Sequence, residues 1–222
     1  SIKGLQKLWY LLSNINHRNH RKLLVIDNNA IWLGSVNVSQ KHLTYNQGGQ
    51  NWRDTALSLH DIDTNIVQSA FNINWFVKKG KAKRRLAQKL TSTPFLLNFT
   101  RALRKKKRKN LISRISAAQE FIWITNAYFI PDTTLLNALI SASKKGIDVR
   151  IILPHKSDII FMPWVSSFFY SQLLGANIRI YEYQAGILHA KTLIIDNWAS
   201  VGSSNLNQRS LQHDLEIDYV LQ

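Results

Sequence analysis

Cysteine is absent from the 222-residue chain. Disulfide bonds and thiolate metal sites are therefore excluded, and the composition fits a reducing compartment. Apolar residues make up 45% of the sequence. That share is enough for one large domain, or for two smaller ones, to bury a hydrophobic core.

Long hydrophobic runs are also absent. A helix that crosses a bilayer needs roughly 20 consecutive apolar residues. The most apolar segment, Ile159–Phe169, is shorter than that and is interrupted by Pro163. The sequence therefore predicts a chain that does not span a membrane by itself but can lie on one. For the longer segment Ile159–Leu174, contact with acyl chains and an ordinary core helix are the two alternatives.

Acidic residues are scarce: 13 Asp and Glu stand against 29 Lys and Arg, which gives a formal net charge of +16. Such an excess indicates an anionic partner, namely nucleic acid, an acidic membrane surface or a phosphorylated substrate. The alternative is a basic surface that only aids solubility. The run Arg101–Lys109 concentrates part of this charge and predicts a solvated linker or the exposed face of a helix.

An approximate internal repeat is the most informative feature. Each copy reads H-x-K-x4-D, followed shortly by G-S-x-N. The first copy supplies His20, Lys22, Asp27, Ser35 and Asn37, and the second supplies His189, Lys191, Asp196, Ser203 and Asn205. One copy alone is a weak signal, whereas two copies with matched spacing indicate a duplicated functional unit.

Each copy is followed by an acid next to a strand-like segment. These acids are Asp54 in the first half and Glu216 in the second. A carboxylate that accepts from one ring nitrogen of a histidine fixes the orientation of the imidazole, as the acid of a catalytic triad does. We therefore expect Asp54 and Glu216 to orient the two histidines, although the sequence leaves open which acid serves which histidine.

The repeated residue types suit chemistry at a phosphate. With an unperturbed pKa near 6.5, a histidine can attack phosphorus or give a proton to a leaving oxygen. Two histidines, His20 and His189, can divide these roles, while Lys22 and Lys191 offer positive charge to the phosphate oxygens. Four neutral donors are expected to help bind the phosphate, namely Ser35, Asn37, Ser203 and Asn205.

Alternation along a strand places Asp27 and Asp196 on the face opposite the histidine and lysine, so we expect both acids to brace the local structure. Two lysines at the centre would repel a cation, and no metal site is expected. Five further histidines lack a repeated partner and are interpreted as surface or structural residues: His17, His42, His60, His155 and His213.

Apolar runs and helix signals alternate along the chain and predict an α/β fold with helices over a sheet. The expected strands are 23–26, 56–59, 121–125, 149–153, 178–181, 192–195 and 219–221, and the expected helices are 132–145 and 163–174. The repeat divides the chain into a first lobe at 1–100, a basic linker at 101–110 and a second lobe at 111–222.

At these motifs the sequence resembles the phospholipase D superfamily, and most closely its bacterial cardiolipin synthases. Six segments carry the resemblance: 19–27, 51–55, 126–131, 188–191, 201–206 and 209–211, the last with the downstream Glu216. The resemblance implies two similar lobes related by a pseudo-twofold axis, each a mixed sheet flanked by helices, with one active site at their seam. It also implies a covalent phosphohistidine, on His20 with His189 as general acid, and neither metal nor cofactor.

The same resemblance implies transfer of a phosphatidyl group between phospholipids, with phosphatidylglycerol as substrate, at the cytoplasmic side of the bacterial membrane. Its partners would be anionic phospholipid and the membrane surface. The alternative is a hydrolase or nuclease of the same superfamily that cleaves phosphodiesters in nucleic acid. Only 19 residues precede His20, so we expect the first lobe to be incomplete and residue 1 not to be the natural start. The sequence leaves the oligomeric state open.

Overall fold

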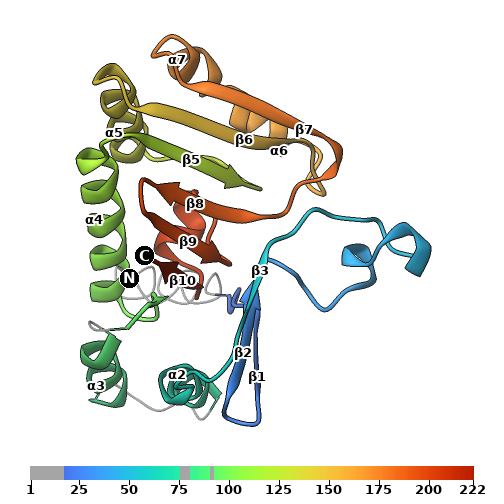
Figure 1. The fold of residues 1–222 in the computed structure, drawn as a ribbon, viewed down its shortest axis with the longest axis vertical. Coiled ribbons are helices and arrows are strands. Elements are labelled where there is room, and N and C mark those ends of the chain that lie inside the picture. The colour runs from blue at the N-terminus through green and yellow to red at the C-terminus, as the bar shows by residue number, and fades with distance from the viewer. Residues whose placement is uncertain (1–17, 76–80, 91–92) are drawn as a thin grey trace, which may run out of the picture.

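Two β-sheets form the centre of the molecule, a small one and a large one (Figure 1). The computed structural model describes residues 18–75, 81–90 and 93–222. The small sheet has three antiparallel strands in the order β1-β2-β3. Its strands and the helices around it are β1 (Leu23–Ile26), β2 (Ala30–Gly34), η1 (Gln40–His42), η2 (Tyr45–Gln47), β3 (Ala56–Leu59), α2 (Asn65–Trp75) and α3 (Lys81–Lys89).

The large sheet has seven strands in the order β4-β10-β9-β8-β5-β6-β7. Strands β5, β6 and β7 run parallel, and the remaining neighbours are antiparallel. Its elements are β4 (Phe95–Leu97), α4 (Arg101–Ala117), β5 (Phe121–Asn126), α5 (Thr133–Lys144), β6 (Asp148–Lys156), α6 (Met162–Ser167), α7 (Tyr170–Leu174), β7 (Arg179–Ile187), β8 (Lys191–Ile195), β9 (Trp198–Gly202), α8 (Gln208–Gln212) and β10 (Ile217–Leu221). The mixed α/β architecture predicted from the sequence is confirmed.

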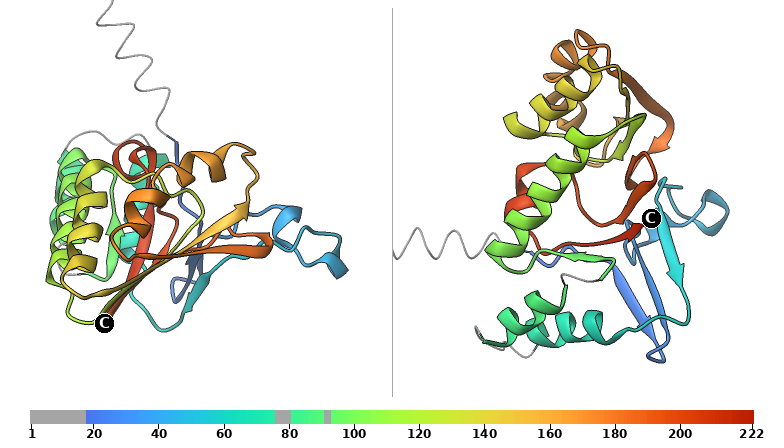
Figure 2. Two further views of the ribbon diagram at one scale, coloured as in Figure 1. Left: turned by 90° about the horizontal axis from the view of Figure 1, so that it is seen from above. Right: turned by 60° about the vertical axis from the view of Figure 1, so that its left-hand side comes forward.

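Alternation along the strands produces the core of the large sheet. Ile122 and Ile124 of β5 point to one face, together with Ile151 of β6, and all three are buried. The buried faces of α4 and α5 cover them, through residues such as Ile115 and Leu139. Figure 2 shows these two helices side by side. Burial of this apolar face is the main force that holds the helices on the sheet.

A second core joins the two sheets. Ile31 and Leu33 of β2 pack in one buried cluster with Val67 of α2. The same cluster includes Leu97 of β4 and Ile217 of β10, which belong to the large sheet. The sheets therefore share a core. Strand β4 lies within the range expected for the first lobe, yet it pairs with β10 at the edge of the large sheet.

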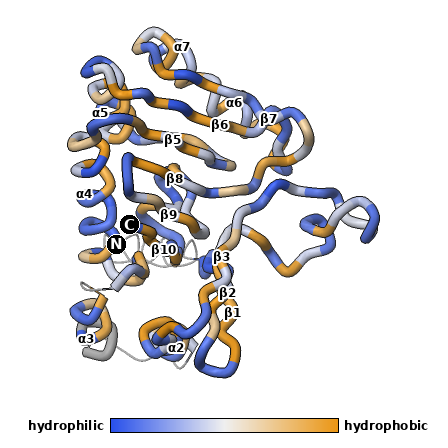
Figure 3. The backbone as a smooth tube through the Cα atoms, in the orientation of Figure 1, coloured by the Kyte–Doolittle hydropathy of each residue, from blue (hydrophilic) through white to orange (hydrophobic). Residues whose placement is uncertain are grey.

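Residues 101–110 separate the two expected lobes, and of the two alternatives for this basic run, a linker or an exposed helix face, they form a helix, the first part of α4. Thr100 caps this helix, because its side chain accepts a hydrogen bond from the backbone of Leu103. Lysine and arginine are good helix formers, and Leu103 and Ile115 anchor the helix to the interior. Figure 3 shows both hydrophilic and hydrophobic positions along α4.

Residues 163–174, expected as one helix, form two short ones. Helix α6 ends at Ser167 and α7 begins at Tyr170. The break lets Leu173 of α7 enter the core while Phe168 stays exposed. Among the described residues, no helix combines the length and the apolar character that crossing a membrane requires.

Candidate active site

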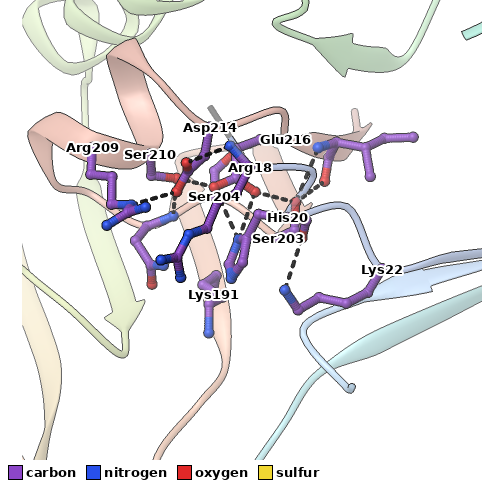
Figure 4. Close-up of polar contacts among 12 residues, drawn as sticks. Arg18, His20, Lys22, Lys191, Ser203, Ser204, Arg209, Ser210, Asp214 and Glu216 are labelled. Atoms are coloured by element: carbon purple, nitrogen blue, oxygen red, sulfur yellow. Dashed lines mark hydrogen bonds and ion pairs between the residues drawn. The ribbon is translucent and has the colours of Figure 1, made fainter. Parts of the chain in front are cut away.

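His20 receives its carboxylate from the other half of the chain (Figure 4). Its Nδ1 lies 3.1 and 3.0 Å from the two oxygens of Glu216, just before β10. The main chain fixes this approach, since the amide of His20 donates to the carbonyl of Leu215 at 2.9 Å. Because a carboxylate only accepts, Nδ1 must carry the proton, and Nε2 is the nitrogen available for chemistry.

His189 shows the reciprocal arrangement. Its Nδ1 lies 2.8 Å from Oδ1 of Asp54, which comes from the first half of the chain. The amide of His189 donates to the carbonyl of Arg53 at 2.8 Å, so the backbone again sets the approach. The two histidine–acid pairs are therefore crossed between the halves. Residue spacing gave no indication of this crossing, because each acid follows the histidine of its own half in sequence.

Ser35 and Ser203 lie behind the two acids. The Ser35 hydroxyl donates to Oδ1 of Asp54 at 2.7 Å, and the Ser203 hydroxyl donates to Oε2 of Glu216 at 2.5 Å. We expected both hydroxyls at the phosphate, but both serines are fully buried and already engaged with the carboxylates. Their contacts hold the acids in place. Ser210 lies in the segment 209–211, to which the sequence assigned no role, and its hydroxyl donates to the other oxygen of Glu216.

Lys22 and Lys191 are bound alike within the two copies of the motif. Lys22 Nζ donates to the carbonyl of His20 at 2.8 Å, and Lys191 Nζ donates to the carbonyl of His189. Burial lowers the pKa of Lys22 to about 8, against the raising effect of Glu216 and Asp54. Burial and the charge of Lys22 lower the pKa of Lys191 to about 7. The charge of Lys22 thus acts on Lys191 across the two halves, and this concentration of positive charge is the electrostatic setting for an anion.

The surroundings of His189 and Asp54 shift the pKa values of both groups. Burial, with the charges of Lys191 and Lys22, lowers the pKa of His189 to about 4 despite its hydrogen bond to Asp54. Burial alone would raise the pKa of Asp54, but its hydrogen bonds with His189, His42 and Ser35 outweigh burial and lower that pKa to about 2. In the free site His189 is therefore neutral at pH 7, and Asp54 is ionised.

His42 is a third histidine of this site, although we interpreted it as a surface or structural residue. Its Nδ1 lies 2.5 Å from Oδ2 of Asp54, the oxygen that His189 does not use. Its ring lies 4.9 Å from that of Trp52 and 5.3 Å from that of His189, measured between centroids. His42 has no counterpart in the second copy of the motif, so the repeat could not reveal it.

The motif asparagines occupy different environments. Asn37 Nδ2 lies 3.3 Å from Nε2 of His42 and stays partly exposed. Asn205 is buried, and its backbone amide donates to the Ser210 hydroxyl at 2.9 Å. Within the described part of the chain, Oδ1 of Asn205 is buried without a hydrogen-bond partner. A buried carbonyl oxygen in that state is costly unless a ligand or water satisfies it.

Asp27 and Asp196 lie away from the histidines, in turns between strands. Both have positive φ, 47° and 51°, a region where aspartate is tolerated better than most residues. Asp196 accepts hydrogen bonds from the amides of Gln119, Glu120 and Phe121 at 2.9, 2.9 and 3.0 Å. It therefore ties the β8–β9 turn to the start of β5, whereas Asp27 lies in the exposed β1–β2 turn.

One group of side chains in the described residues has ligand atoms close enough for a metal ion. His42, Asp54 and His189 place these atoms within 4.8 Å of one another. Their closeness follows from the two hydrogen bonds to Asp54, in which both imidazoles use Nδ1. The lysine charges that lower the His189 pKa also oppose a cation there. The chemistry of this group fits a hydrogen-bonded relay better than a metal site.

A cavity of about 590 Å³ lies between α4 and the large sheet. Lys191 and Asn126 line its wall, so the cavity reaches the site. The rest of the lining is mostly apolar, with residues such as Leu97, Leu193 and Trp198. The basic side chains of α4, including Lys107, also contribute to it.

Comparison with known sequences identifies the family. Residues 111–222 match the family model described as "Cardiolipin synthase, PLD-like domain". The chain thus belongs to the phospholipase D-like family that includes the cardiolipin synthase domains. It is 33% identical over 225 residues to a cardiolipin synthase of Halalkalibacterium halodurans, covering 97% of this chain and 45% of that protein. It is 35% identical over 223 residues to cardiolipin synthase 2 of Bacillus cereus, covering 95% and 43%. The chain spans less than half the length of these relatives.

Solved structures agree with the fold. The phosphatidylserine synthase of Haemophilus influenzae superposes with a TM-score of 0.63 at 15% identity, covering 91% of this chain and 57% of that one. The polyphosphate kinase of Porphyromonas gingivalis superposes with a TM-score of 0.58 at 12% identity, covering 92% and 31%. At such low identities the likeness concerns the fold alone.

Proposed function

We propose that this chain forms the catalytic part of a cardiolipin synthase-type phosphatidyltransferase that acts on phosphatidylglycerol. The observation that carries the proposal is the crossed pair of histidine–carboxylate contacts, His20 with Glu216 and His189 with Asp54, beside the partly buried Lys22 and the buried Lys191. Each imidazole is oriented through Nδ1, which leaves both Nε2 atoms for phosphorus and for the leaving oxygen.

The proposed reaction has two steps. Nε2 of His20 attacks the phosphorus of a first phosphatidylglycerol, a P–N bond forms, and the P–O bond to glycerol breaks. His189 gives a proton to that departing oxygen. In the second step His189 takes the proton from a hydroxyl of a second phosphatidylglycerol, whose oxygen attacks phosphorus and breaks the P–N bond. Two phosphatidylglycerol molecules yield one cardiolipin and one glycerol, while Lys22 and Lys191 neutralise the non-bridging oxygens.

The general acid must hold a proton when glycerol leaves. In the free site the lowered pKa of His189 keeps it neutral at pH 7. A phosphodiester anion between Lys22 and Lys191 would offset their charge, and we expect it to raise the His189 pKa toward the working pH. Trapping the covalent intermediate tests the assignment. An adduct on His20 supports the proposed order of roles, and an adduct on His189 would reverse it.

The lipid substrate is supported by the cardiolipin synthases that the chain resembles and by the apolar cavity that reaches Lys191. The basic composition, with a net charge of +16, suits an anionic bilayer. On these grounds we place the protein peripherally on the cytoplasmic side of the bacterial membrane. A nuclease of the same superfamily is the competing function, since its active site would use the same residue types.

The decisive assay incubates the intact protein with phosphatidylglycerol vesicles and, separately, with DNA. We expect cardiolipin and released glycerol from the vesicles. H20A and H189A should each abolish turnover, whereas H155A should not, because His155 is an exposed histidine that pairs with Glu182 outside the site. DNA cleavage without lipid turnover would overturn the proposal, and so would full activity in either active-site variant.

A further inference from the structure

Four large apolar side chains stand exposed around α6. Ile160, Phe161, Trp164 and Phe168 are 83%, 57%, 71% and 79% exposed, and we call them the aromatic patch. Single exposed apolar residues are ordinary in soluble proteins, but a group of this size within nine positions marks an interaction surface.

Helix α6 buries a polar side chain and exposes an aromatic one, which is the opposite of the usual pattern of a core helix. Its one fully buried residue is Ser166, while Trp164 faces solvent. The helix lies against β6 and is followed directly by α7 (Figure 1). Leu173 of α7 is buried. The fold therefore fixes α6 in place and directs its aromatic side chains outward.

Charge is missing from this region in a strongly basic chain. Residues 159–178 include no Asp, Glu, Lys or Arg. The exposed residues just before them are His155, Lys156 and Asp158, and the carboxylate of Asp158 accepts a hydrogen bond from the Tyr128 hydroxyl. An uncharged aromatic surface beside a basic residue matches the interface of an anionic bilayer, where tryptophan and phenylalanine enter and lysine meets the headgroups. Most protein partners would need polar groups to pair with at the rim of such a surface.

Two contacts connect the patch to the active site. Asp158, immediately before the patch, accepts a hydrogen bond from the Tyr128 hydroxyl at 2.5 Å. The Tyr128 ring in turn lies 5.8 Å from Nζ of Lys191, measured to its centroid. The patch therefore adjoins the rim of the site rather than a remote face.

We propose that the aromatic patch inserts into the headgroup region of a phospholipid bilayer and holds the active site against the lipid surface. This inference rests on the proposed function for its purpose, but the contact itself is independent of turnover. A peripheral protein gains affinity in this way from a few buried aromatic side chains together with basic residues.

The first test measures binding of the intact protein to vesicles of phosphatidylglycerol and phosphatidylcholine by co-sedimentation. We expect W164S/F168S to bind about 100-fold more weakly than the parent, since each buried aromatic side chain contributes about a factor of ten. The matched control is F71S/W75S, which removes an exposed stacked pair from α2. We expect this control to bind as the parent does. Unchanged binding of W164S/F168S, or equal loss in both variants, would overturn the proposal.

A second test does not depend on removing side chains. The chain has no cysteine, so S167C and S141C each introduce a single thiol for an environment-sensitive fluorophore. Ser167 is exposed on α6, and Ser141 is exposed on α5. Vesicles should shift the emission of the label at 167 to the blue and leave that at 141 unchanged. If the emission of the label at 167 does not shift, the proposal is overturned, and a protein partner becomes the expected occupant of the patch.

The two proposals fail in different ways. If the parent binds vesicles through the patch but forms no cardiolipin, the proposed function is wrong and the membrane contact stands. If the parent forms cardiolipin while W164S/F168S binds vesicles as well as the parent does, the membrane contact is wrong and the function stands.

Discussion

His189 and Asp54 are 135 positions apart in the sequence, yet Nδ1 of the histidine lies 2.8 Å from Oδ1 of the acid. The reciprocal pair, His20 and Glu216, is 196 positions apart. Each motif histidine therefore takes its acid from the other half of the repeat. The site is a property of the docked halves, and the shared core of β2, β4 and β10 stabilises that docking.

Removing the charge of either acid should stop turnover with little change in shape. We expect D54N and E216Q each to lower kcat by about 10³-fold or more, because the imidazole loses the partner that fixes its tautomer. The measurement is cardiolipin formation at saturating phosphatidylglycerol. E182Q is the control, because it alters an exposed histidine–glutamate pair outside the site. Activity near the parent level in D54N would contradict the orienting role.

Replacing Lys191 with methionine should stabilise the protein while abolishing activity. Burial lowers the pKa of Lys191 to about 7, so the folded chain holds this charge at a cost that an apolar side chain of similar size avoids. We expect K191M to melt at a higher temperature than the parent and to show no turnover. K144M, at an exposed lysine of α5, should leave both the melting temperature and the turnover unchanged. A lower melting temperature for K191M would show that the ammonium group supports the fold.

The same lysine makes stability depend on pH. Its pKa is about 7 in the folded chain and near 10.4 when unperturbed, so the unfolded chain binds more protons between these values. The free energy of unfolding should therefore rise as pH increases from about 7 toward 10. Denaturant titrations at several pH values measure this slope, which should be smaller in K191M than in the parent. Equal slopes would contradict the burial of a charged lysine.

An anion should stabilise the free site. Inorganic phosphate between Lys22 and Lys191 would relieve the repulsion between them, and a ligand present at 100 times its Kd stabilises the folded state by about 2.7 kcal/mol. We expect the melting temperature to rise with phosphate concentration in the parent and much less in K191M. Sodium chloride at equal ionic strength is the control for general screening. The same rise in both proteins would place the anion elsewhere.

His42 should act as a positioning residue for Asp54. If the Nδ1–H of His42 is removed, Asp54 loses one of the hydrogen-bond donors that lower its pKa. The same donor holds the second carboxylate oxygen of Asp54 in place. We expect H42F to reduce kcat about tenfold, as the loss of one orienting hydrogen bond to a charged group suggests. KM should not change, and the pH–rate profile should shift. H60F, at an exposed histidine, should retain the parent profile. An unchanged profile in H42F would limit His42 to packing.

Local patterns in the sequence were sufficient for much of the fold. The apolar runs gave β1 and β8, and Asp132 with Gly146 bounded α5 within about a residue of its observed limits. Strands β6 and β7 proved longer than expected, because their second halves carry polar residues that no apolar pattern reveals. The basic run of α4 fits either a linker or an exposed helix face in the sequence, and the cap at Thr100 with the buried Leu103 identifies it as a helix.

The residues of the site also divide into those that local sequence patterns predict and those that only the folded structure reveals. His20, Lys22, His189 and Lys191 follow from a repeated local spacing, and the structure brings them together. The crossing of the acids is a tertiary relationship that no local spacing encodes. His42 escaped notice because it belongs to a loop with no counterpart in the second half. The hydrogen bond from Ser35 to Asp54 could be recognised only in the folded structure, which shows where the acid lies.

The crossed pairs also set an order in time. A ribosome makes the chain from its N-terminus, and Glu216 follows His20 by 196 residues. Until Glu216 has been made, His20 has no carboxylate to orient it, and Asp54 precedes its partner His189 by 135 residues. A chain whose two halves have not yet docked therefore leaves both histidines without the acids that orient them in the folded structure. The complete site forms only when the two halves have packed against each other.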